Sequence, residues 1–242
     1  MLKTLRREVE DLLNRPISSA VIVAPNILAL YEEDLVDAFE WIGLKYIDVA
    51  YINGVIYETH AAYAGYGFGL CANYTDPEVC HHEELAMDRD RVLSVLFTNS
   101  ALFVGNDVLA NAYWLWEPQH RVKLNFSLGY DNPLGMDEYH YFKSIGENLR
   151  ANILNWPKDM RPNKVLLQGE CASKQNFKQI LNISLLDLIK DLWDNVYMND
   201  TIFVNSKGAA EFAKRMLWDR SHNGTWSPHR PKPPVEQSVE LK

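Results

Sequence analysis

The order of extended and helical segments in the C-terminal part of the chain restricts the folds open to it. We predict a meander of strands from three successive β-rich segments, Val92–Thr98, Ala101–Trp116 and Arg121–Leu128. Helical and extended segments then alternate, which predicts helices at Met136–Leu154, Lys174–Leu192 and Lys207–Trp218 and strands at Lys164–Gln168 and Tyr197–Val204. This order indicates an α/β fold.

The N-terminal part has a similar mixture of elements. Apolar residues at helical spacing predict a helix at Leu2–Leu13 with one buried face, and a β-branched run closed by Pro25 predicts a buried strand at Ala20–Ala24. The further elements predicted are a helix at Glu32–Trp41, an extended run at Tyr46–Tyr57 broken by a hairpin at Asn53-Gly54, and an Ala- and Gly-rich helix within His60–Leu70. The whole pattern suggests two α/β lobes.

The expected domain organisation follows from these elements. Residues 1–70 form part of a first lobe and its connecting helix, residues 71–91 form a loop or hinge without sustained periodicity, and residues 92–220 form the second lobe. Residues 221–242 are rich in Pro and are expected to be a disordered tail.

The charge of the chain bears on its partners and its compartment. A formal net charge of −8 opposes nonspecific binding to nucleic acid or to anionic membranes, and we expect neither as a partner. The N-terminal segment lacks the apolar core of a secretory signal, so we expect a cytoplasmic protein. Five N-x-S/T sequons begin at Asn73, Asn125, Asn182, Asn199 and Asn223, and they would matter if an upstream segment directed the chain to the secretory pathway.

Four segments in the same order resemble the seventy-kilodalton heat-shock chaperones. ETHAAYAGYGF at Glu58–Phe68 resembles their lobe-joining segment, and AVIVAP at Ala20–Pro25 is similar to their AVITVP strand. VLLQGE at Val165–Glu170 resembles their strand and turn beside the adenosine, and GAAEFAKR at Gly208–Arg215 resembles their final helix. The resemblance is nearest to fungal proteins with a chaperone-like ATPase fold. It implies the two-lobed, ribonuclease-H-like fold of actin-like ATPases, here with an incomplete, N-terminally truncated first lobe.

The resemblance also implies a cofactor, ATP with magnesium, held by two Gly-rich phosphate hairpins. The first hairpin belongs before residue 1, and the second, Asp-Leu-Gly-Gly-Gly-Thr in the family, falls near Ser94–Ser100. Ser94 replaces the metal-organising aspartate, and Leu96 and Phe97 replace glycines, so we expect their side chains to fill the phosphate path.

The cofactor-binding candidates that remain are Ser94, Thr98, Gly169 and Glu170. At the adenosine turn Glu170 stands in place of the second glycine, and its charge would oppose a triphosphate.

Two residues are candidates for catalysis. Glu58 matches the family's glutamate that organises a magnesium-bound water, and His60 beside it has the side chain of a base near neutral pH. Glu58 without its aspartate partner cannot supply the electrostatic stabilisation that phosphoryl transfer needs, so we expect weak or absent ATP binding and weak or no hydrolysis.

Three hypotheses about function remain open at this stage. The first is a pseudo-ATPase that binds a protein partner or a small molecule as a scaffold, or that forms oligomers through the incomplete lobe. The alternative is an enzyme that uses Glu58 and His60, with Cys171 as a further candidate, on a small non-nucleotide substrate in a closed pocket of the remodelled interlobe cleft. The third is the C-terminal part of a longer or two-chain ATPase.

The cysteines allow several readings. Cys71 and the run Cys80-His81-His82-Glu83 contain zinc-ligand types, but their spacing fits no usual zinc pattern, so no metal site is expected. Cys71 and Cys80 would form a disulfide in a secreted protein and remain free thiols otherwise. Cys171 lies at a strand-to-helix turn, either as a thiol activated by the helix N-terminus or, as we prefer, as a buried thiol.

Overall fold

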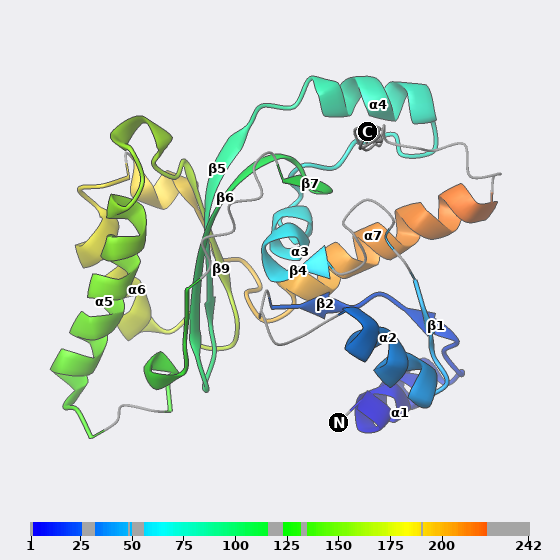
Figure 1. Ribbon diagram of the computed structural model, residues 1–242, viewed down its shortest axis with the longest axis horizontal. Helices are drawn as coiled ribbons and strands as arrows, with labels where there is room; N and C mark the ends of the chain where they lie inside the picture. Colours follow the sequence, from blue (N-terminus) through cyan, green and yellow to red (C-terminus); the bar gives the residue numbers. More distant parts are fainter. Residues whose placement is uncertain are drawn as a thin grey trace, which may run out of the picture.

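A computed structural model describes residues 2–25, 32–47, 49, 56–115, 123–131, 135–189 and 191–221. It is a mixed α/β protein built around one large sheet (Figure 1). Helices α5 and α6 cover one face of this sheet, and helices α3 and α7 cross the other face. A smaller N-terminal part, with α1 and α2, lies beyond α3 and α7.

The large sheet has six strands in the described residues, in the order β10-β9-β5-β6-β7, with β8 also paired to β6. The strands are β5 (Asp90–Phe97), β6 (Leu102–Asn111), β7 (Trp114–Leu115), β8 (Lys123–Asn125), β9 (Lys164–Gln168) and β10 (Val196–Tyr197). The β5–β6 hairpin is antiparallel, and β8 is antiparallel to β6, whereas β9 runs parallel to both β5 and β10. The predicted meander and the buried strand predicted at Lys164–Gln168 are therefore confirmed. The extended run predicted at Tyr197–Val204 is wrong over most of its length, because β10 ends at Tyr197 and α7 (Val204–Ser221) begins at Val204.

The face covered by α5 (Glu138–Leu154) and α6 (Gln175–Leu185) carries the main apolar core. Alternate residues of β5, namely Leu93, Val95 and Phe97, point into this core because successive strand side chains face opposite sides. The Phe97 ring packs on Phe177 of α6 with centroids 4.7 Å apart. Helix α6 ends seven residues before the boundary predicted at Leu192, and it is followed by turns and the 3₁₀ helix Leu192–Asn195.

The opposite face is crossed by α3 (Glu58–Gly65) and α7 (Val204–Ser221). These two helices touch through glycine. A Cβ added to Gly208 would lie 1.8 Å from the carbonyl oxygen of Ala61, and one added to Gly65 would lie 2.0 Å from that of Val204. The contact therefore tolerates no side chain at either position, which explains why these helices are rich in Gly and Ala.

The N-terminal part consists of short elements joined in parallel pairs. They are α1 (Leu2–Leu13), β1 (Ser19–Ala20), β2 (Val23–Ala24), α2 (Glu32–Trp41), β3 (Lys45–Tyr46) and β4 (Ile56–Tyr57). The single strand predicted at Ala20–Ala24 is two strands, because β1 pairs with β3 and β2 pairs with β4. The hairpin predicted at Asn53-Gly54 lies outside the described residues.

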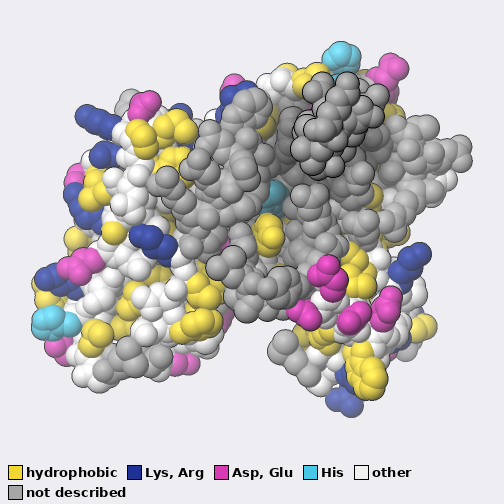
Figure 2. Space-filling view, in the orientation of Figure 1, with side chains coloured by type: hydrophobic (Ala, Val, Ile, Leu, Met, Phe, Trp, Pro, Cys, Tyr) yellow, Lys and Arg dark blue, Asp and Glu magenta, His cyan; other side chains and the backbone are white. Residues whose placement is uncertain are grey.

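The expected burial of α1 is wrong. No residue of this helix is buried, and the apolar side chains of Leu5 and Leu12 are 51% and 84% exposed. Trp41 at the end of α2 is 79% exposed. Figure 2 shows hydrophobic and acidic side chains gathered over this part of the surface.

The segment predicted to be a loop, 71–91, contains a helix, α4 (Pro77–Leu85). The helix begins after Asp76, whose Oδ1 accepts the backbone N–H groups of Glu78 and Val79 at 3.1 Å each, and Pro77 follows at the first helical position. The residues of this cap are visible in the sequence, but α4 lacks the apolar periodicity that predicts the other helices. Within the described residues no helix has the length and apolar character to cross a bilayer.

We predict that Gly208→Ala destabilises the fold. An exposed helical Gly→Ala change normally adds up to about 1 kcal/mol of stability. Here the new methyl group must displace the α3 backbone, so we expect the free energy of unfolding to fall by about 1–3 kcal/mol. Urea unfolding followed by circular dichroism measures the change, with Ser206→Ala on the exposed side of α7 as the control. A more stable Gly208→Ala variant would show that the contact between the two helices is loose.

Candidate functional site

Two turns meet at the edge of the sheet where the parallel strands β5 and β9 end. Residues Thr98–Ala101 connect β5 to β6, and Gly169 begins the turn between β9 and α6. Gly169 has φ +90°, and a Cβ there would lie 2.4 Å from the carbonyl oxygen of Phe97. The Cys171 N–H donates to the same oxygen at 3.1 Å, so the two turns are joined through their backbones. In open α/β sheets, ligands bind at the carboxyl ends of the strands.

The β5–β6 turn is held closed by Thr98. The Thr98 N–H donates to the Ala101 carbonyl at 3.0 Å, and the Thr98 Oγ1 accepts the Ala101 N–H at 3.0 Å. The Thr98 carbonyl also accepts the Tyr130 N–H at 3.0 Å. Thr98 thus fixes the shape of the turn with its own polar groups.

Glu170 places a carboxylate directly on this turn. Its Oε1 accepts the backbone N–H of Asn99 at 2.8 Å. A backbone N–H in a turn is the kind of donor that cradles phosphate in nucleotide-binding loops. Here the protein's own carboxylate satisfies that donor. Thr98, Gly169 and Glu170, three of the four expected cofactor-binding residues, therefore come together.

The fourth of these residues, Ser94, does not join them. It lies in the interior of β5, buried, where its Oγ accepts the Nε2 of Gln168 at 2.6 Å. The turn between β5 and β6 is Thr98–Ala101, so it overlaps only the C-terminal end of the segment Ser94–Ser100 expected to correspond to the phosphate hairpin. The expectation that Phe97 fills the phosphate path is also wrong, because its ring is in the core against α6. Leu96 remains beside the turn, with a Cδ1 atom 3.1 Å from the Cβ position of Gly169.

The two expected catalytic residues lie in the first turns of α3, both buried. The His60 Nδ1 is 3.0 Å from the carbonyl oxygen of Ala112, which follows β6. The β5–β6 turn is at the other end of β6, a strand of ten residues, so about 30 Å of strand separates His60 from Cys171 and the turn. A single pocket formed by Glu58, His60 and Cys171 is therefore ruled out.

Cys171 is a buried thiol, which is the alternative that we preferred over a thiol activated by the helix N-terminus. Burial is the largest cause of a raised pKa for this thiol, with Lys174 acting in the opposite direction. Its Sγ donates to the Asn99 Oδ1 at 3.1 Å, which gives it a structural role in joining the two turns. A raised pKa keeps the thiol protonated and poorly nucleophilic.

The opposite edge of the sheet carries a polar cluster that was not predicted. Asp90 opens β5 and Lys164 opens β9, and their side chains form an ion pair at 2.8 Å. The Tyr63 hydroxyl donates to Asp90 at 2.5 Å, and burial followed by this bond raises the pKa of Tyr63. An open surface pocket of about 590 Å³ adjoins this cluster, and a second of about 530 Å³ lies beside it, near Arg91. The sequence signal that could have predicted this cluster is a charged residue at the first position of each strand, Asp90 in β5 and Lys164 in β9.

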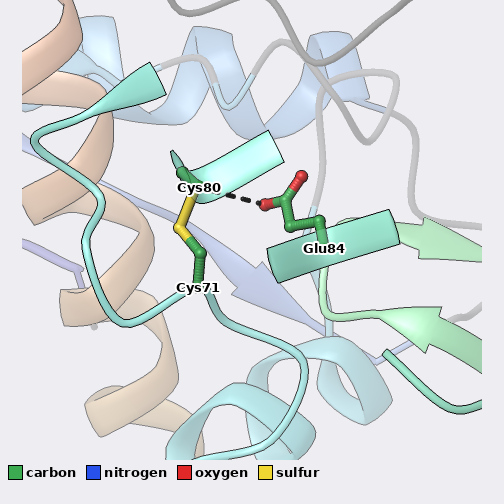
Figure 3. A group of neighbouring side chains, drawn as sticks. All are labelled: Cys71, Cys80 and Glu84. Atoms are coloured by element: carbon green, nitrogen blue, oxygen red, sulfur yellow. Dashed lines mark hydrogen bonds between the residues drawn. A yellow bond between two sulfur atoms is a disulfide. The ribbon is translucent and has the colours of Figure 1, made fainter. Parts of the chain in front are cut away.

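The disulfide alternative for the cysteine-rich segment is the one observed. Cys71 and Cys80 are bonded, both buried, and the bond ties the chain after α3 to α4 (Figure 3). Their sulfur atoms and the carboxylate of Glu84 lie within 4.8 Å of one another, with Glu84 Oε1 3.7 Å from Cys80 Sγ. A disulfide offers no thiolate to a metal, so in this state the group is a covalent link and not a zinc site. Glu84 was missed, although its spacing of four from Cys80 places both on one helix face.

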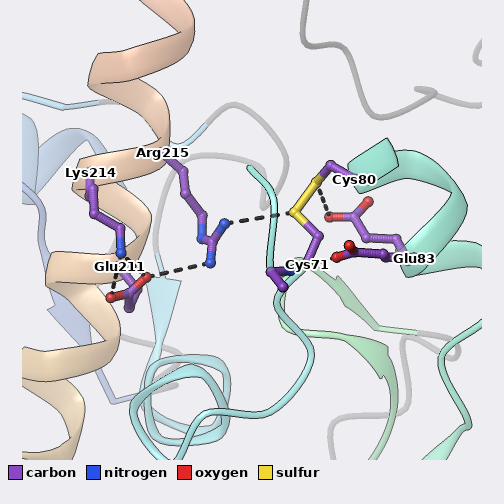
Figure 4. Close-up of polar contacts among 8 residues, drawn as sticks. Cys71, Cys80, Glu83, Glu211, Lys214 and Arg215 are labelled. Carbon is purple, nitrogen blue, oxygen red and sulfur yellow. Dashed lines mark hydrogen bonds and ion pairs between the residues drawn. A yellow bond between two sulfur atoms is a disulfide. The ribbon is translucent and has the colours of Figure 1, made fainter. Parts of the chain in front are cut away.

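Arg215 of α7 faces the same disulfide (Figure 4). Its Nη1 lies 3.7 Å from Cys71 Sγ, and its Nη2 is 3.4 Å from a carboxylate oxygen of Glu211. Burial raises the pKa of Glu84 to about 7, with the Arg215 charge acting in the opposite direction. The buried Glu84 carboxyl therefore loses its proton, and becomes negatively charged, near neutral pH.

Two comparisons with known proteins found no match for this chain. No protein-family model matches it, and no curated protein matches it.

We predict that Glu84 makes stability depend on pH. The folded state keeps the Glu84 proton up to a pKa of about 7, whereas the unfolded chain releases it near 4.5, so stability falls as pH rises through this interval. Glu84→Gln should remove this loss and be more stable than wild type at pH 8 by about 1–3 kcal/mol. Urea unfolding without reductant at pH 5 and pH 8 measures the difference. The exposed Glu78→Gln on the same helix is the control, and an equal pH slope in Glu84→Gln and wild type would refute the assignment.

Proposed function

We propose that this protein is a degenerate member of the actin-like, heat-shock-chaperone-like ATPases that works as a binding or scaffold protein with weak or no ATP hydrolysis. The fold part of the proposal rests on topology. A three-stranded meander, β5, β6 and β8, is followed by the parallel strands β9 and β10, with helices between them. This is the arrangement we expect of one ribonuclease-H-like lobe.

The helix pair gives the second support. The segments resembling the chaperones' lobe-joining segment and final helix are α3 and the start of α7. They lie far apart in the sequence and are in contact through Gly65 and Gly208. Two collinear resemblances that also meet in space agree better with common ancestry than either does alone.

The loss of nucleotide chemistry rests on one observation, the bond from the Asn99 N–H to the Glu170 carboxylate. A phosphate at this turn would have to displace the Glu170 carboxylate from its hydrogen bond, and it would then lie beside the negative charge of that carboxylate. The lost hydrogen bond and the charge repulsion both disfavour phosphate binding. The turn residues themselves, Thr98, Asn99 and Ser100, carry side chains where a phosphate cradle uses glycine.

Exposed apolar side chains in the N-terminal part support the proposal that the protein binds a partner through its surface. The apolar side chains of Leu5, Leu12 and Trp41 are more than half exposed on α1 and α2. Such a concentration of exposed apolar residues is typical of a contact surface for a protein partner or a second copy.

Calorimetric titration tests the proposal. We expect no saturable heat from magnesium-ATP or magnesium-ADP added to the wild-type protein. Glu170→Gly removes the charge and frees the Asn99 N–H, so it should raise affinity for magnesium-ADP by roughly tenfold or more relative to wild type.

The matched variant Glu170→Gln removes the charge and keeps an oxygen acceptor, so it should gain less than Glu170→Gly. Micromolar binding of magnesium-ATP with hydrolysis by the wild type would overturn the proposal. If neither the wild type nor Glu170→Gly gives a saturable heat of binding, the protein does not bind the nucleotide, and the role given to Glu170 is refuted.

A further inference from the structure

The number of glycosylation sequons exceeds the chance level. The chain has 19 Asn and 18 Ser or Thr among 242 residues, and a random arrangement of these residues would produce only about one or two N-x-S/T motifs. It has five, at Asn73, Asn125, Asn182, Asn199 and Asn223. The Asn, Ser and Thr content of the chain therefore does not explain the number of motifs.

The disulfide is an independent observation that points to the same environment. Cys71 and Cys80 are joined in the interior, where Arg215 and Glu84 pack around the bond. Structural disulfides persist in the secretory pathway and outside the cell, and they are rare in the reducing cytosol. N-linked glycans are found on surface loops of secreted proteins.

The fold separates the four described sequons by their surroundings. Asn73 lies in the exposed turn inside the loop that the disulfide closes. The Thr75 hydroxyl donates to the Asn73 Oδ1 at 2.9 Å, and both residues are exposed. A sugar on the Asn73 Nδ2 would extend into solvent.

Asn199 lies in the turn between β10 and α7 and is also exposed. The next residue, Asp200, has φ +64°, and the carbonyl of Thr201 accepts the Gly169 N–H at 2.9 Å. The turn is therefore anchored from within while the Asn199 side chain remains outside. A glycan here would stand beside the Gly169–Glu170 turn.

In the other two described sequons the Asn side chain is less exposed to solvent. Asn182 is half-buried within α6, and its Oδ1 accepts the Trp193 Nε1–H at 2.7 Å. Asn125 is half-buried and caps the 3₁₀ helix Phe126–Leu128 by accepting the Ser127 N–H at 2.9 Å. Asn223 lies outside the described residues.

We propose that the protein matures in an oxidising compartment and carries N-linked glycans at Asn73 and Asn199. In each reaction the Nδ2 bonds to the anomeric carbon of a lipid-diphosphate-linked oligosaccharide, the bond from that carbon to the diphosphate breaks, and one amide proton is released. The Cys71 and Cys80 thiols give two electrons and two protons to a protein disulfide, which becomes a dithiol. This compartment differs from the cytoplasm expected from the N-terminal sequence.

Mass spectrometry of the full-length protein purified from its own cells tests the proposal. Peptide N-glycosidase digestion in heavy-oxygen water converts each glycan-bearing Asn to heavy-oxygen-labelled Asp, and we expect the label at Asn73 and Asn199. Non-reducing peptide mapping should show the Cys71–Cys80 link. Unlabelled Asn73 and Asn199, or free thiols at Cys71 and Cys80, would overturn the proposal.

Variants expressed in the same cells assign each glycan. Asn73→Gln and Asn199→Gln should each lose the mass of one glycan, and Thr75→Ser should retain the Asn73 glycan because it keeps the motif. Asn155→Gln, at an exposed Asn outside any sequon, should leave the mass of the glycans unchanged. Loss of no glycan from either sequon variant would contradict the assignment even if the protein is glycosylated elsewhere.

Discussion

The close contact between α3 and α7 is the constraint on which the rest of the structure depends. Helix α3 continues directly from β4 of the N-terminal part, and α7 follows the last strand of the large sheet. Their glycines bring the two backbones together, so that β2 of the N-terminal part touches both helices. A single apolar cluster then runs from the N-terminal strands through both helices to the sheet. Without the glycines the two parts would be held at a greater distance and this cluster would not close.

The same arrangement separates the polar groups of the sheet into two edges. At one edge the backbone groups of two turns are satisfied by Glu170, Cys171 and Thr98. At the other, Asp90 and Lys164 are paired beside an open surface pocket. The first edge has the position of a ligand site in an open α/β sheet, yet the backbone N–H groups of Thr98, Asn99, Ala101, Gly169 and Cys171 already donate to acceptors within the chain. This is the physical reason for proposing a protein that keeps the architecture of an ATPase without its chemistry.

The disulfide extends the α3–α7 contact to α4. It fixes Cys71, shortly after α3, to the first turns of α4, and Arg215 of α7 lies against it. A cation and a buried carboxyl beside a disulfide make this corner polar inside an apolar cluster, and the proximity of Arg215 and Glu84 lowers the cost of burying either. The covalent link also favours the compartment proposed for the glycans, since the reducing cytosol would not preserve it.

Local patterns in the sequence were sufficient for most elements. The boundaries of α1, α2 and β9 follow directly from apolar spacing and β-branched runs, because these signals depend on neighbouring residues alone. The helix α4 was missed because its signal is a cap and not a periodicity. The division of Ala20–Ala24 into two strands was not predictable, since it depends on which distant strand each half pairs with.

For the candidate site, the sequence by itself determined that Gly169 and Glu170 end a buried strand and that glycine is scarce in the facing hairpin. It also supplied the sequons and the cysteines. Only the tertiary structure decided that Glu170 reaches the Asn99 amide, that Phe97 belongs to the core, and that His60 lies at the far end of β6. The physical reason is that strand register and helix crossing set these distances, and both are fixed by contacts between residues far apart in the chain.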